Sequence, residues 1–170
     1  MGSTAINERG AVLASTVRDS GSVVSKDTNV TLPAISPVES DFNAMGPMTL
    51  PTMAQIENME TSISKNGTDA NVAKLSEPKM HNIEVRWVQP VLKPNGTMKN
   101  EGCKAFIKGT PKGFPSLGIE PGSKTESEIL YSTVRMQIFA GNKELCCVDR
   151  LAGILRINGK DYYKDISSLL

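Results

Sequence analysis

The chain has 170 residues, a formal net charge of +1, 39% hydrophobic residues and 5% aromatic residues. This length suits one domain with arms and is sufficient to bury a core. The sequence contains no run of about eighteen apolar residues, so a membrane-spanning helix is not expected. With Gly 14 and Pro 10, the composition predicts many turns and a β-rich protein with part of its surface irregular.

The N-terminal residues and the cysteines indicate the compartment in which the chain folds. Residues 1–10 lack the basic-then-apolar pattern of a secretory signal. The cysteines are Cys103, Cys146 and Cys147, an odd number without CxxC spacing, which argues against a disulfide framework or a zinc site. We therefore expect a chain that folds in a reducing cytoplasm and is not secreted by a signal peptide.

Charge is distributed unevenly along the chain. Residues 27–64 contain no Lys, Arg or His, where about four basic residues would be expected from the overall frequency. The formal charges of residues 1–26, 27–64, 65–112 and 113–170 are +1, −5, +5 and 0. A base-free acidic wall repels polyanions, and adjacent segments of opposite charge suit self-association of identical subunits. The alternative interpretation is an acidic, solvated loop.

The first third of the chain predicts an N-terminal arm followed by a long hairpin. Residues 1–27 are polar and weakly patterned, with a short strand conceivable at 11–17, and we interpret them as an arm. Alternation of apolar and polar residues predicts strands at 36–43 and 58–64. The stretch 42–52, rich in Met, Gly and Pro, suits a hairpin tip. We expect the two strands to form a hairpin with one polar, acidic face.

The rest of the chain predicts further antiparallel strands and one helix. Thr68 is a plausible N-cap for a short helix that ends before Pro78. Strands are expected at 81–92, 103–108, 126–139 and 144–157. Asn158-Gly159 is typical of a type I′ turn. The prediction is a mainly β fold, an antiparallel β-sandwich or barrel of seven or eight strands with one short flanking helix and a long hairpin.

Residues that could support catalysis or metal binding are sparse. His81 is the single histidine, and nothing in the sequence marks a partner for it. Glu39 and Asp41 share a strand face at a spacing too generic for acid–base work. The Lys-rich segment 93–112 has only Phe106 available for base stacking, so a solvated or partner-facing hairpin is the preferred interpretation. The methionines between 45 and 59 suit adaptable packing better than metal binding. We expect no enzyme activity, no metal and no cofactor.

Three stretches, taken in order, resemble a known family. Residues 29–35 read Asn-Val-Thr-Leu-Pro-Ala-Ile, and residues 42–46 read Phe-Asn-Ala-Met-Gly, followed later by Asn66-Gly67. The third begins Gly-Ser-Lys-Thr-Glu-Ser-Glu at residues 122–128 and runs into the strand at 129–139. It continues at 141–145 and closes with Ile-Asn-Gly-Lys-Asp at 157–161. Together these resemble the major tail tube protein of contractile-tailed bacteriophages and of the related R-type bacteriocins.

The resemblance implies a structural subunit rather than an enzyme. Members of the family form a small β-barrel or sandwich, and six subunits close into a ring by joining their sheets. Stacked hexameric rings form a hollow tube that conducts DNA in a phage or punctures the target envelope in a bacteriocin. The implied divisions are an N-terminal arm at 1–27, a tail-tube β domain at 28–166 and a C-terminal tail at 167–170.

The resemblance also implies partners and site residues. The partners are further copies of the chain, the tail sheath protein, the baseplate and tail terminator proteins and, in a phage, the tape measure protein and DNA. The location is the tail of a virion or phage-like particle, made in the host bacterial cytoplasm. The family's lumen wall corresponds to residues 28–64, so the candidate lumen-lining acids are Glu39, Asp41 and Glu60. The candidates for ring-stacking contacts are Met45, Gly46 and Met48.

Two alternatives stay open at this point. The first is the effector-carrying tube protein of a type VI secretion-like system, which shares the fold. The second, from a different class, is a β-barrel that encloses a small molecule, which predicts a monomer with an apolar interior. The acidic hairpin face and the scarcity of aromatic residues count against the barrel.

Overall fold

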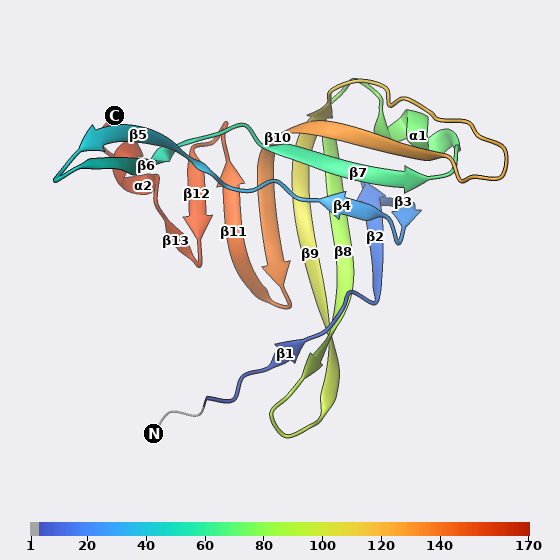
Figure 1. The fold of residues 1–170 in the computed structure, drawn as a ribbon, viewed down its shortest axis with the longest axis horizontal. Helices are drawn as coiled ribbons and strands as arrows, with labels where there is room; N and C mark the ends of the chain where they lie inside the picture. The colour runs from blue at the N-terminus through green and yellow to red at the C-terminus, as the bar shows by residue number, and fades with distance from the viewer. Residues whose placement is uncertain (1–3) are drawn as a thin grey trace.

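The structure of the chain is a computed structural model that describes residues 4–170, with the Met53 side chain left aside. The strands of this range pair antiparallel and form one large sheet and one two-stranded sheet (Figure 1). The elements of the first half are β1 (Glu8–Arg9), β2 (Ala14–Asp19), β3 (Ser22–Lys26), β4 (Asn29–Thr31), β5 (Pro37–Asn43), β6 (Pro47–Ile56), β7 (Glu60–Asn66) and α1 (Ala70–Leu75). Those of the second half are β8 (His81–Leu92), β9 (Met98–Pro111), β10 (Glu126–Ala140), β11 (Lys143–Asp149), β12 (Ile154–Ile157), β13 (Lys160–Asp161) and α2 (Lys164–Ser167).

The long strand β10 joins the two layers of the molecule. Its first half pairs with β7, and from Tyr131 onward it pairs with β9 and then β11. A register shift between Thr133 and Arg135 marks the place where β10 turns from one layer into the other. The main path of the large sheet runs β13-β12-β11-β10-β9-β8-β2-β3, and β4 and β7 lie across its inner face (Figure 1).

The core lies between these layers because alternate side chains of each strand point to the same side. Its largest cluster draws on β2, β3, β7, α1, β8, β9 and β10: Val17, Val24, Ile63, Leu75, Ile83, Val85, Ala105, Ile107, Ile129 and Tyr131. A second cluster of Met59, Val148 and Leu155 lies near the hairpin end. The alternation on which the strand at 58–64 was predicted is confirmed, since Met59, Thr61 and Ile63 are fully buried.

The expected mainly β, antiparallel fold is confirmed, and several of its details differ from the prediction. A second short helix, α2, follows β13, and the N-cap of α1 is Asp69 rather than Thr68: the Asp69 carboxylate accepts a hydrogen bond of 2.9 Å from the Asn71 N–H. A short strand was conceivable at 11–17; the structure has the β2–β3 hairpin at 14–26, and this hairpin pairs with β8 and contributes to the core. The type I′ turn is confirmed by positive φ angles of 52° at Asn158 and 81° at Gly159.

A further difference concerns the long hairpin. Residues 36–43 were predicted to pair with residues 58–64, and this pairing is wrong. Strand β5 pairs with β6, whereas β7 pairs with β10 on one side and β4 on the other. Alternation identifies the residues that share a face but not the neighbouring strand, and Pro47 and Pro51 gave β6 the composition of a loop.

Candidate functional site

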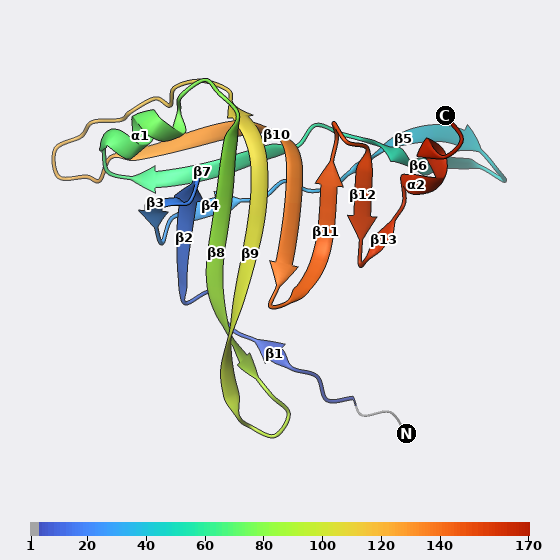
Figure 2. The ribbon, with the colours of Figure 1, turned by 180° about the vertical axis from the view of Figure 1, so that it is seen from behind.

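The β5–β6 hairpin is a two-stranded sheet of its own that projects from one end of the molecule (Figures 1 and 2). At its tip, Asn43 pairs with Pro47 across the loop 44–46. The Asn43 side-chain oxygen accepts a hydrogen bond of 3.1 Å from the Gly46 N–H. Met45 adopts a left-handed backbone conformation, with φ of 56°, and its side chain is fully exposed.

The register of this hairpin separates its side chains into two faces of different chemistry. Residues that lie opposite each other on antiparallel strands point to the same side. One side, the acidic face, consists of Glu39, Asp41, Asn43, Pro47, Thr49 and Pro51. The other, the apolar face, consists of Val38, Ser40, Phe42, Met48, Leu50 and Thr52. The hairpin is therefore an amphipathic ribbon.

The apolar face is exposed in the single chain. Val38, Phe42, Met48 and Leu50 expose 42%, 44%, 42% and 52% of their surface. An isolated two-stranded hairpin is at best marginally stable in water and gains stability when its hydrophobic face is covered. A contiguous exposed apolar patch of this kind marks an interaction surface. The geometry thus favours an ordered hairpin whose apolar face is buried by a partner.

The base of the hairpin is attached to the body by hydrogen bonds to its main chain and by apolar packing. Two guanidinium nitrogens of Arg150 donate hydrogen bonds of 3.1 Å to the carbonyl oxygens of Ile56 and Glu57. The Glu57 N–H also donates to the Ser36 carbonyl oxygen at 2.8 Å. Ile35 and Ile56 pack against the second core cluster. These contacts fix the direction in which the ribbon leaves the body.

The structure brings together two of the three candidate lumen acids. Glu39 and Asp41 lie two residues apart on the acidic face, both exposed, and neither has an ion-pair partner within residues 4–170. Glu60 lies instead at the start of β7, opposite Ser132 of β10, and its carboxylate forms an ion pair with Lys112. Met45 and Gly46 are at the hairpin tip, and Met48 is on the apolar face.

Basic side chains of β2, β8, β9 and β10 gather elsewhere, on the face of the large sheet opposite the core. Arg86 lies opposite Lys104, and Lys108 lies opposite Arg135, with Arg18 opposite Glu84 nearby. The acids of this face are already engaged: Glu84 with Arg86, Asp149 with Arg135, and Glu144 with Arg156. The Arg156 guanidinium beside Glu144 lowers the pKa of that carboxyl below its ordinary value. Sequence reasoning missed this cluster because its members come from four strands and meet only through pairing.

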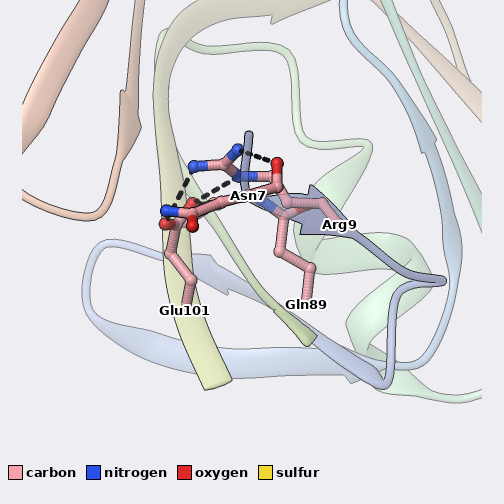
Figure 3. A network of polar contacts seen from close by, with 5 residues as sticks. Asn7, Arg9, Gln89 and Glu101 are labelled. Atoms are coloured by element: carbon pink, nitrogen blue, oxygen red, sulfur yellow. Dashed lines mark hydrogen bonds and ion pairs between the residues drawn. The ribbon is translucent and has the colours of Figure 1, made fainter. Parts of the chain in front are cut away.

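The N-terminal strand β1 lies along the projecting ends of β8 and β9 (Figures 1 and 3). Arg9 Nε and Nη2 each donate to a different Glu101 carboxylate oxygen at 3.4 Å, and Gln89 donates to the same carboxylate at 3.1 Å. The hydrogen bond from the Arg9 guanidinium is the largest cause that holds the pKa of the Glu101 carboxyl below its ordinary value, and the hydrogen bond from the Gln89 amide is the second. Arg9 also donates to the Asn7 carbonyl oxygen at 3.5 Å. These hydrogen bonds hold β1 against the projecting ends of β8 and β9.

Other site classes were sought over the described part of the chain. Residues 4–170 contain no group of three or more His, Cys, Asp or Glu placed to hold a metal ion. None of the helices in that range is long and apolar enough to cross a membrane. Burial raises the pKa of the Cys103 and Cys146 thiols, which disfavours the reactive thiolate form.

An open antiparallel sheet with a projecting amphipathic ribbon defines a class of protein that functions by associating with other chains. The family of phage tail tube protein FII matches residues 14–170, and the chain belongs to this family. It is a structural subunit of a tail tube, a component of the tail of a virion or phage-like particle. The family match favours this function over the ligand-binding barrel.

One solved structure has a similar fold. It is a chain of the PVC sheath–tube complex, an extracellular contractile injection system in its extended state. The TM-score is 0.50 with 14% sequence identity, and the likeness covers 74% of this chain and 88% of that one. Among curated proteins, none matches the sequence.

Proposed function

We propose that copies of this chain assemble into hexameric rings that stack into a hollow tube inside a contractile sheath. The observation that carries the proposal is the ordered β5–β6 ribbon with an uncovered apolar face, in a chain of the tail tube family. Burying such a face between subunits stabilises both the ribbon and the assembly. The similarity to a chain of a sheath–tube complex supports the presence of a surrounding sheath protein. The function needs no catalysis.

The acidic face of the ribbon is the proposed lining of the lumen. Lys and Arg near DNA form salt-dependent phosphate contacts, so a wall that must let DNA pass should lack them. Glu39 and Asp41 are the charged residues of the segment 37–56, which contains no basic residue. Glu60 stays a candidate at the neighbouring start of β7, with Lys112 neutralising part of its field. Phosphates moving along this face meet repulsion rather than ion pairs.

The remaining partners follow from a tube of this kind. Met45 and Gly46 at the tip, with Met48, are the proposed contacts between stacked rings. The ends of the tube meet baseplate and tail terminator proteins, and the lumen holds the tape measure protein and DNA in a phage. In a bacteriocin the same tube punctures the target envelope. The chain is made in the host bacterial cytoplasm and assembles there.

Negative-stain electron microscopy of the purified protein over a series of rising concentrations tests the proposal. Hollow rings or tubes with sixfold symmetry are the expected result. In analytical ultracentrifugation of the same samples, the fraction of chains in rings should rise with protein concentration and the fraction of monomer should fall. A species that stays monomeric up to the highest concentration reached would overturn the proposal.

A further inference from the structure

A buried histidine contacts the main chain just after α1. His81, the first residue of β8, is 1% exposed. On one side its Nδ1 is 2.9 Å from the Asp19 carboxylate of β2, and on the other its Nε2 is 2.8 Å from the Glu77 carbonyl oxygen. The His81 and Tyr131 rings pack edge to face, with their centroids 5.7 Å apart. Each ring nitrogen of His81 therefore has one oxygen as its neighbour.

Both of these oxygens are acceptors. A carbonyl oxygen and an ionised carboxylate accept hydrogen bonds and donate none. Both contacts are therefore hydrogen bonds only while the His81–Asp19 pair holds two protons. A carboxyl group is ordinarily the stronger acid of the two, so both protons lie on the ring, which is then an imidazolium. A neutral imidazole has a single N–H and can bind only one of the two oxygens.

Loss of one ring proton breaks the contact with the carbonyl. The remaining proton stays on Nδ1, because an ionised carboxylate is a stronger acceptor than a carbonyl oxygen. The Nε2 lone pair of His81 then faces the Glu77 carbonyl oxygen, and two acceptors at this distance repel each other. The same carbonyl oxygen also accepts a hydrogen bond of 2.7 Å from the Lys79 N–H. It therefore keeps a donor when it moves away from the ring.

The α1 segment, residues 70–80, depends on such contacts for its order. Its helix has six residues, too few to be stable without packing. Val72 and Leu75 are buried against the body, and the Leu75 carbonyl oxygen accepts a hydrogen bond from the Tyr131 hydroxyl. The buried Ser76 hydroxyl finds no hydrogen-bond partner within residues 4–170. The contact of the histidine ring is thus a large part of what holds the end of this segment.

We infer that His81 is a proton-dependent clasp for the α1 segment: the doubly protonated ring holds the segment closed, and loss of one ring proton opens it. The clasp stabilises the closed segment while the ring holds both protons, and this contribution is lost as the pH rises. Opening uncovers the apolar side chains of Val72 and Leu75. The segment lies toward the end of the molecule opposite the β5–β6 hairpin (Figures 1 and 2), and the clasp does not depend on the proposed assembly.

The other charged groups around the ring keep their charge between about pH 5 and about pH 10. The exposed Glu77 and Lys79 side chains form an ion pair, whose hydrogen bond lowers the pKa of Glu77 and raises the pKa of Lys79. Burial, with the Asp19 carboxylate adding to it, raises the pKa of Tyr131, so that hydroxyl keeps its proton. Histidine is the side chain that ordinarily changes its charge within this range.

Nuclear magnetic resonance of the full chain tests the clasp, in solution or, where the chain assembles, in the solid state. His81 is the single histidine, so the ring nitrogen signals of labelled protein show directly whether one or both nitrogens carry a proton. Hydrogen exchange of the α1 segment, corrected for the intrinsic rate at each pH, shows how often the segment opens. We expect its protection to fall about tenfold or more as the ring loses its proton, the effect of losing one charge-assisted hydrogen bond. The protection of β7 should stay constant.

Asp19→Asn separates the clasp from general effects of pH. The amide nitrogen at this position can donate to Nδ1 of a neutral His81 ring, which then needs only its Nε2 proton to bind the Glu77 carbonyl. The α1 segment of this variant should therefore stay protected over the whole pH range. Glu77→Gln is the matched control, because it removes an exposed carboxylate but keeps the carbonyl oxygen. Its segment should respond to pH as in the unmodified chain.

Several results would overturn the clasp. One is a ring with a single N–H over the whole pH range. Another is a protection that stays constant while the ring loses its proton, or that falls while the ring keeps both protons. These two need no variant. The last is an Asp19→Asn variant, shown by circular dichroism to be folded, whose α1 segment loses protection with rising pH as the unmodified chain does.

Discussion

His81 Nδ1 lies 2.9 Å from a carboxylate oxygen of Asp19, and both side chains are buried. His81 Nε2 lies 2.8 Å from the Glu77 carbonyl oxygen, just after α1. A carbonyl oxygen only accepts, so Nε2 carries the proton of that bond, and a doubly protonated ring also donates to the Asp19 carboxylate. Through this one side chain, β2, β8 and the segment after α1 are tied together.

Breaking this pair should destabilise the fold strongly. We expect His81→Leu to lower the free energy of unfolding by about 3–5 kcal/mol, because the Asp19 carboxylate then stays buried without its partner. Urea denaturation followed by the fluorescence of Trp87 measures the change. The exposed Lys79, paired with Glu77, provides a control, and Lys79→Ala should leave the urea midpoint almost unchanged. Equal losses in the two variants would contradict the assigned role of His81.

Tyr131 should make stability depend on alkaline pH. Its hydroxyl donates to the Leu75 carbonyl oxygen, and burial, with the Asp19 carboxylate adding to it, raises the pKa of Tyr131 above its ordinary value. The folded chain therefore keeps this proton at a pH where the unfolded chain has lost it. Stability from this group is complete below about pH 10 and falls as the pH rises further, by up to about 1.4 kcal/mol per pH unit.

Tyr131→Phe separates this effect from the titration of other groups. The variant should be less stable than the unmodified chain at neutral pH by about 1–3 kcal/mol, because the buried Leu75 carbonyl loses its donor. Its urea midpoint should then fall less steeply than that of the unmodified chain above about pH 10. Parallel slopes in the two proteins would show that Tyr131 does not control the alkaline loss.

Local sequence patterns predicted most strands but not how they are combined. Met59, Thr61 and Ile63 alternate with polar residues, and all three are buried as their pattern indicates. The Thr61 and Thr133 hydroxyl oxygens, 2.6 Å apart in the core, are 72 residues apart in sequence, and no local pattern predicts such a contact. Strand β6 was missed because a two-stranded sheet tolerates proline, since each of its strands has a free edge. For the site, alternation placed Glu39 and Asp41 on one face, but the separation of Glu60 from them depends on long-range pairing.

Gly109 of β9 lies opposite Thr133 of β10, where a side chain would have little room. A Cβ at this position would lie 3.0 Å from the Ser132 carbonyl oxygen and 3.3 Å from Tyr131 Cβ. We expect Gly109→Ala to lower the free energy of unfolding by about 1–3 kcal/mol through overpacking. Gly102 on the same strand has no atom within 4 Å of such a Cβ, so Gly102→Ala is the matched control and should be near neutral. The urea denaturation midpoints of the two variants measure this difference. If Gly109→Ala unfolds at the same urea concentration as the unmodified chain, β10 shifts to make room for the added methyl group.

The acidic face of the ribbon can be tested by reversing its charge. Glu39→Lys combined with Asp41→Lys should leave assembly intact, because both residues point away from the apolar face. Assembled particles of this variant should bind duplex DNA, with an affinity that falls steeply as salt rises, since each new phosphate contact releases counterions. Co-sedimentation of a labelled duplex with the particles over a series of salt concentrations measures the binding.

Two controls define what this result means. Glu39→Gln with Asp41→Asn removes the negative charge without adding a base, and its particles should bind DNA far more weakly than those of the lysine variant. Lys160→Glu reverses a charge on β13, outside the ribbon, and should leave the particles as inert toward DNA as the unmodified ones. If unmodified particles bind DNA as strongly as the lysine variant does, repulsion at Glu39 and Asp41 does not keep the wall free of DNA. If the lysine variant assembles but does not bind, the acidic face is not accessible to DNA and another surface lines the channel.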